Sequence, residues 1–336
     1  MRELSNQSKW QPWKGVILQV AALIMLLTLG RFMQRSLGPV GLIGSELLFL
    51  ILAISYTLIQ KTPLKEVFPI RKISLRDFFG TGFLWAGTLA FGFMSIYLAW
   101  IVFPGTFMKV LENLNTALDI PNPFLSFFTI AIVAPICEES IERGAVLSHF
   151  RSVKKDWLVV LIIGIFFGIM HTDPIRFINT SLMGAVAAYL MIKKDNFLLP
   201  LMIHFFTNGS GSILSYFRGF IISEDIADAA LKNVDPVMQL GSSMILFCLA
   251  PFAICLGFHL LMPKLAGKVP VEEKKSRTRK LTRNYIIAGA ATVLMLTGGV
   301  IMLVTNPAFL KMYEDSYSSV FASMNAAREM FLILMP

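Results

Sequence analysis

The sequence predicts an all-α integral membrane protein, a polytopic helical bundle of about nine transmembrane helices (eight to nine). Of its 336 residues, 55% are hydrophobic and only 15% are charged, whereas roughly a quarter of the residues in ordinary soluble domains are charged. The apolar residues also fall in long blocks, and about 20 helical residues cross a hydrocarbon core of about 30 Å. Because lipid cannot satisfy exposed backbone groups, these blocks must be helices.

The apolar blocks divide the chain into nine expected spans. The first block is too long for the apolar part of a cleavable signal and lacks a small-residue cleavage site after it. We also expect an amphipathic interfacial helix over 62–79 and an amphipathic tail after Pro307 that includes 320–335. Three regions follow: N-terminal helices with the interfacial segment (1–123), a central region (124–217), and C-terminal helices with a basic loop and tail (218–336). The expected spans are 16–34, 41–60, 78–103, 124–150, 157–172, 177–192, 197–217, 237–262 and 285–304.

The distribution of basic residues predicts the orientation. With the N-terminus in the cytoplasm, the inside segments hold 21 of the 30 Lys and Arg residues and the outside segments hold eight. This bias favours an N-terminus inside and a C-terminus outside, in a multi-pass protein of the plasma membrane. Eight basic residues lie between Lys264 and Arg283, without interleaved aromatic residues. We therefore interpret this stretch as a cytoplasmic loop beside anionic lipid, and not as a nucleic-acid site.

Ionisable side chains inside three of the spans need an explanation, because each costs at least a few kcal/mol in the membrane. The fourth span contains Glu138, Glu139, Glu142 and Arg143, while the other spans are almost free of charge. The fifth contains Phe167 and His171, and the seventh contains His204 and Asn208. Residues four apart share a helix face, so Glu139 is placed to pair with Arg143. The loop between the fourth and fifth spans also puts Glu138 and His171 at one depth.

This set of side chains is typical of peptide hydrolysis inside a membrane. Hydrolysis needs a water molecule at the scissile carbonyl and a base that takes its proton. A carboxylate in an apolar site can be that base, while imidazole and amide groups hold the water and stabilise the oxyanion that develops. Glu138, His171, His204 and Asn208 supply these groups. Neither a Ser/His/Asp set nor a Gly-rich phosphate loop is recognisable in the sequence.

The three motifs, taken in order, resemble the signature of the CAAX protease and bacteriocin-processing (CPBP, or Abi) family of intramembrane proteases. The matching segments are Glu138-Glu139-x-x-x-Arg143, Phe167-x-x-x-His171 and His204-x-x-x-Asn208. The resemblance covers about 124–212. It implies an intramembrane endopeptidase in which Glu138 activates water, supported by Glu139 and Arg143. It further implies that His171, His204 and Asn208 orient the water and stabilise the oxyanion, and that Phe167 shapes the substrate pocket.

Several alternatives stay open at the level of sequence. Glu138, His171 and His204 can in principle hold zinc, although they do not form a His-Glu-x-x-His motif, so a glutamate mechanism and a metalloprotease are both possible. The implied partners are the lipid bilayer and a membrane-associated peptide or protein substrate. Two other functions compete with the protease: a non-proteolytic membrane regulator or bacteriocin-immunity scaffold of the same family, and an ion-coupled transporter.

Overall fold

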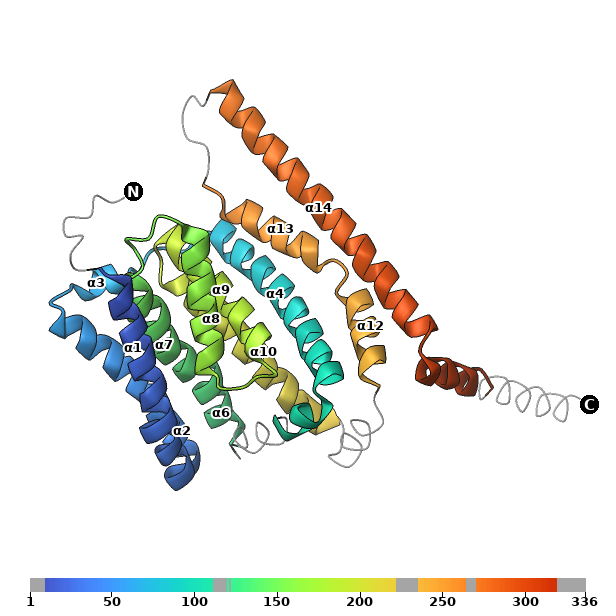
Figure 1. Cartoon of the computed structure of the whole chain (residues 1–336), viewed down its shortest axis with the longest axis horizontal. Coiled ribbons are helices and arrows are strands. Elements are labelled where there is room, and N and C mark those ends of the chain that lie inside the picture. Colours follow the sequence, from blue (N-terminus) through green and yellow to red (C-terminus); the bar gives the residue numbers. More distant parts are fainter. Residues whose placement is uncertain (1–9, 111–119, 121, 222–234, 264–269, 319–336) are drawn as a thin grey trace, which may run out of the picture.

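The computed structural model of the chain is all-helical over the residues it describes, which are 10–110, 120, 122–221, 235–263 and 270–318. Its helices lie in one bundle (Figure 1), with α1 and α2 at one edge and α14 along the other. In order along the chain, with π-helical segments labelled η, the elements are α1 (Pro12–Met25), η1 (Leu26–Gly30), α2 (Arg31–Ile59), α3 (Leu64–Val67), α4 (Leu75–Val102), α6 (Pro123–Phe127), η2 (Phe128–Val133), α7 (Ala134–Glu139), η3 (Ser140–Val146), α8 (Asp156–Met170), α9 (Phe177–Lys194), α10 (Leu198–Ile221), α12 (Pro236–Leu246), α13 (Ala250–Leu261) and α14 (Val271–Val304).

Each of the nine expected spans is helical over most of its length, but length and hydropathy alone identify fewer candidates for crossing a membrane. Within the described residues, four helices qualify, or five if the bent pair α12 and α13 is one span. They are 12–59, 75–102, 123–146 and 271–304. The chain is thus a helical membrane protein, whereas nine crossings, the orientation and the three-region division stay predictions.

The first long helical stretch is a hairpin. Gly38 has φ +54°, a backbone conformation that side chains disfavour, and Pro39 follows it. The two arms then pack closely, because a Cβ at Gly41 would lie 1.9 Å from the Met33 carbonyl oxygen. Gln34 also donates a hydrogen bond to Ser45 Oγ at 2.8 Å. The break therefore separates the two spans that the sequence predicts over 16–34 and 41–60.

Three of the expected segments differ from the structure or lie partly outside the described residues. The interfacial helix over 62–79 is wrong, because only Leu64–Val67 is helical before α4 begins at its Ser74 cap. The intervening segment instead exchanges hydrogen bonds with Asn196 through the Arg71 backbone, and these bonds replace those of a helix.

The described part of the basic stretch is also no loop, since α14 already begins at Val271. At about 1.5 Å per residue, the 34 residues of α14 form a helix that is longer than the hydrocarbon core is thick. The charged first half therefore continues the helix outside the apolar part that can span this core. The expected tail after Pro307 is helical as far as 318, and its remaining part, including 320–335, lies outside the described residues.

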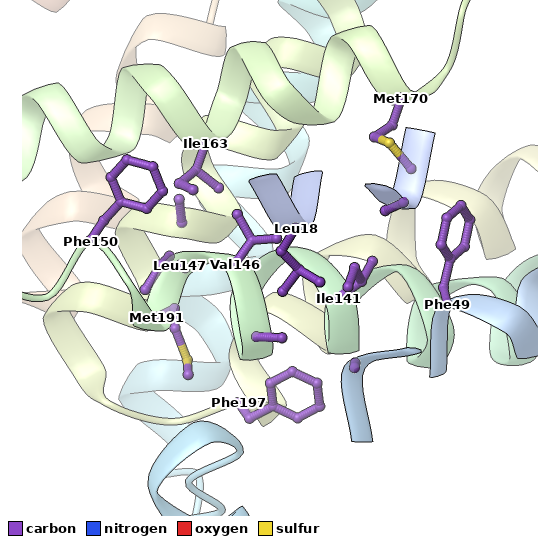
Figure 2. Close-up of a cluster of buried hydrophobic side chains, with 14 of the residues drawn as sticks. Leu18, Phe49, Ile141, Val146, Leu147, Phe150, Ile163, Met170, Met191 and Phe197 are labelled. Atoms are coloured by element: carbon purple, nitrogen blue, oxygen red, sulfur yellow. The ribbon is translucent and has the colours of Figure 1, made fainter. Parts of the chain in front are cut away.

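The central helices pack around an apolar core that fixes the fourth span. This core joins α1, α2, the α7–η3 segment, α8 and α9 (Figure 2). Among its buried side chains are Leu18, Phe49, Ile141, Val146 and Ile163. Burying a side chain of this size is worth about 1.5–3 kcal/mol against water, but in lipid the close fit between helices contributes more. The carboxylate-bearing segment is consequently enclosed on several sides.

Candidate functional site

The fourth span departs from α-helical geometry on both sides of Glu138 and Glu139. The π-helical segments η2 and η3 flank the α-helical stretch Ala134–Glu139, and Glu142 lies within η3. In π geometry the Ile130 carbonyl would accept a bond from residue 135, which is proline and has no N–H. Asn208 Nδ2 fills this vacancy and donates to the Ile130 oxygen at 2.9 Å. Proline therefore does not simply kink the span, but opens an acceptor that ties α10 to it.

Glu139 is the best-bonded carboxylate of the site. Its Oε1 accepts a hydrogen bond from His204 Nδ1 at 2.8 Å and lies 3.0 Å from Arg143 Nη1. All three side chains are almost fully buried. The predicted Glu139–Arg143 ion pair is thus present. Its link to His204 was not predicted, because helical spacing cannot reveal contacts between different spans.

Arg143 and Phe167 form the interior of the site. The guanidinium lies 4.4 Å from the centre of the Phe167 ring and donates through Nη2 to the Gly184 carbonyl at 3.1 Å. The Phe167 ring also contacts the rings of His171 and His204, with centroids 4.7 and 5.5 Å apart. Phe167 is only 1% exposed. It therefore acts as the packing centre of the three motifs, and its expected role in shaping a substrate pocket stays a prediction.

His171 directly follows the last residue of α8, and a hydrogen bond to that helix fixes its ring. Its ring donates from Nδ1 to the carbonyl of Phe167, one turn earlier, at 2.9 Å. This bond directs Nε2 away from the helix, because the two nitrogens lie on opposite sides of the ring. The same logic applies to His204, whose Nδ1 is bound to Glu139. Both imidazoles are thus fixed through one nitrogen.

Glu138 differs from its neighbours. It is only partly buried, whereas Glu139 and Glu142 are buried. It has no hydrogen bond or salt bridge to another described residue, yet it lies within electrostatic range of Glu139, Arg143 and His204. Glu142 accepts a hydrogen bond from Gln19 Nε2 at 2.8 Å and so faces α1. Within the carboxylate triplet, Glu138 alone combines accessibility with an unengaged carboxyl group.

Two polar residues near the site are missed by the sequence analysis. Gln19 in α1 and Glu46 in α2 are buried, and both face the fourth span. The criterion that identifies the fourth span would also have found Glu46, because Glu46 is an ionisable side chain inside an apolar block. Glu46 is the one charged residue of the second expected span, 41–60, and it is an exception that the expectation of spans almost free of charge passed over.

The described residues do not assemble a metal site. No group of three or more His, Cys, Asp or Glu side chains in this part of the chain is placed to share one ion. The Nδ1 bonds of His204 and His171 leave both Nε2 atoms free, as in metal-ligating histidines, so the lack of fit rests on the positions of the side chains alone. The arrangement therefore does not fit the zinc ligand set Glu138, His171 and His204.

Comparison with known proteins bears on this segment. Residues 120–210 match the family model described as type II CAAX prenyl endopeptidase Rce1-like. Residues 120–210 are a CPBP-family region. This CPBP region contains every residue of the three motifs. An uncharacterized 24.3 kDa protein of Escherichia coli is 32% identical to the chain over 91 residues. That alignment covers 26% of this chain and 42% of the E. coli protein. No solved structure matches.

Proposed function

We propose that the protein is an intramembrane endopeptidase that hydrolyses a peptide bond of a membrane-associated protein or peptide with a water molecule activated by Glu138. At the level of family, a protease of the CAAX type follows from the CPBP region. The choice of Glu138 as base rests on one observation: Glu139 is occupied by Arg143 and His204, and Glu142 by Gln19, whereas Glu138 is accessible and unengaged.

In the proposed reaction, Glu138 takes a proton from water while the oxygen attacks the scissile carbonyl. A positioned base of this kind contributes about 10²- to 10⁴-fold to a rate. With Nδ1 as the donor of each ring, the Nε2 atoms of His171 and His204 are acceptors that can hold the attacking water. The amide group of Asn208 donates to the oxyanion that forms. Collapse of the intermediate breaks the C–N bond, and the proton held by Glu138 passes to the leaving amine. Glu139 and Arg143 keep His204 oriented throughout.

An apolar groove beside the site supports a substrate embedded in the membrane. It has a volume of about 470 Å³ and lies between α4 and α10. Its lining is mostly aromatic and includes Phe78, Trp85, Phe127, Phe205 and Phe206. Phe205 and Phe206 directly follow His204 in the sequence, so α10 carries residues of both the groove and the polar site. The family description names a type II CAAX prenyl endopeptidase, and an apolar groove suits a lipid-modified or otherwise apolar peptide.

A comparison of membrane peptides in cells tests this function while the substrate is still unidentified. Cells that express the wild-type protein are compared with cells that express equal amounts of the Glu138→Gln variant, and new peptide termini in the membrane fraction are mapped. We expect termini that the wild-type protein generates and the variant does not. Glu142→Gln serves as a matched control, because it changes the same residue type on the same span and should generate the wild-type termini. Identical termini in all three strains would contradict the proposal.

A further inference from the structure

A fourth buried carboxyl group faces the site from another helix. Glu46 lies in the second arm of α2 and is 8% exposed. Its Oε2 is buried and has no hydrogen-bond partner among the described residues. In the same part of the chain no basic side chain forms a salt bridge with it. A buried carboxyl group in such a position is costly in a membrane, and an unpaired ionised one is costlier still.

The packing of α2 places Glu46 beside Glu138. Phe49 and Ala53 of α2 share one buried cluster with Cys137 and Ile141. Cys137 also contacts the Leu50 backbone, and Glu46 precedes Leu50 by one helical turn on the same face. Glu46 also lies within electrostatic range of Glu138. Glu46 and Glu138 thus both belong to the region where α2 packs against the α7 segment.

The charges of the site determine which form Glu46 takes. Four carboxyl groups (Glu46, Glu138, Glu139 and Glu142) surround one guanidinium, and that guanidinium is paired with Glu139. Two like charges close together in an apolar site do not both persist. The least costly arrangement puts the proton on Glu46, the more buried of the two, and the negative charge on the more exposed Glu138. A neutral carboxyl group can then donate a hydrogen bond towards Glu138.

We propose that Glu46 is a positioning residue of the site, a neutral carboxyl group that orients Glu138 from the α2 side. This inference rests on the proposed role of Glu138 as the base. It adds that the site includes a helix outside the CPBP region, and that the first hairpin takes part in catalysis. Glu46 need not touch the substrate, because it acts by holding the base in its productive orientation.

Enzyme kinetics test the positioning role with a peptide identified by the membrane comparison. Glu46→Leu removes the donor and should lower kcat on the order of 10- to 100-fold, as small misplacements of a catalytic group do, while KM stays unchanged. Glu46→Gln keeps a donor of similar size and should retain a kcat within a few-fold of wild type. Thr57→Val is the matched control, since Thr57 is a buried polar residue of α2 whose hydroxyl bonds only its own helix. If Glu46→Leu does not fold, Glu46→Asp replaces it, because it withdraws the carboxyl group by one methylene.

A double-mutant cycle on the melting temperature tests the same contact without any substrate. Glu46→Leu and Glu138→Ala are measured alone and together in purified protein. The combined loss in Tm should be clearly smaller than the sum of the single losses, because either change alone removes the shared interaction. The pair Thr57→Val and Glu138→Ala should be additive. Additivity for Glu46 and Glu138 would overturn the inference. Coupling without any detectable proteolysis would leave the contact standing and contradict the proposed function instead.

Discussion

His204 Nδ1 donates a hydrogen bond of 2.8 Å to Glu139 Oε1, and this bond joins two helices whose residues are 65 positions apart. Arg143 binds the same oxygen at 3.0 Å. One carboxylate thus carries an intrahelical and an interhelical contact, and it holds the first and third motifs together. Loss of the Glu139 carboxylate should therefore lower the stability of the fold more directly than it lowers the rate of the reaction.

Glu139→Gln should destabilise the protein, on the order of 3 kcal/mol, because it leaves the buried Arg143 without a counter-charge. The double variant Glu139→Gln, Arg143→Met should regain much of this loss, since it removes the stranded charge and keeps an apolar side chain of similar length. Thermal unfolding of purified protein measures both effects. If the double variant is less stable than Glu139→Gln, the ion pair is not what holds this part of the fold.

Gln19 and Glu142 should respond unequally to substitution. Gln19→Leu removes the donor to Glu142 Oε1 and leaves a buried carboxyl group unpartnered, at a cost of about 1–3 kcal/mol. Glu142→Gln keeps an acceptor for Gln19 and should unfold near the wild-type temperature, with proteolysis almost unchanged. Equal destabilisation by the two changes would show that the contact between α1 and η3 does not govern stability here.

Gly184 is expected to tolerate no side chain. A Cβ at this position would lie 2.7 Å from the Phe167 Cβ, so α8 and α9 must separate and disturb the ring that packs Arg143, His171 and His204. Gly184→Ala should therefore cost about 1–3 kcal/mol and lower activity. Gly211→Ala is the matched control, because nothing lies within 4 Å of a Cβ there and alanine favours a helix. Equal melting temperatures for the two variants would contradict the close packing of Phe167.

The orientation of the chain can be tested on α14. Ser276 lies in its charged first half, among the basic residues that predict a cytoplasmic position. Ser276→Cys is introduced into a protein whose three native cysteines are replaced by alanine. A membrane-impermeant thiol reagent should label it only after cells are permeabilised. Labelling of intact cells would reverse the predicted topology.

The sequence contained enough information for the helical membrane fold and for the ion pair of Glu139 with Arg143, because helical periodicity determines contacts within one span. It did not reveal contacts between spans. The bond from His204 to Glu139, the bond from Asn208 to Ile130 and the packing of α2, which carries Glu46, against the fourth span depend on how the helices pack. The mistaken interfacial helix over 62–79 has the same origin, since bonds to Asn196 hold part of that segment out of a helix.

Hydrolysis in water labelled with ¹⁸O tests the central claim most directly, with purified protein and the peptide identified in cells. The wild-type protein should place one ¹⁸O atom in the new carboxyl terminus. Glu138→Gln keeps the shape of the side chain but removes its basicity, so it should lower the rate by about 10²- to 10⁴-fold while the melting temperature stays close to that of the wild type. Cleavage by a well-folded Glu138→Gln variant at the wild-type rate would show that Glu138 is not the base.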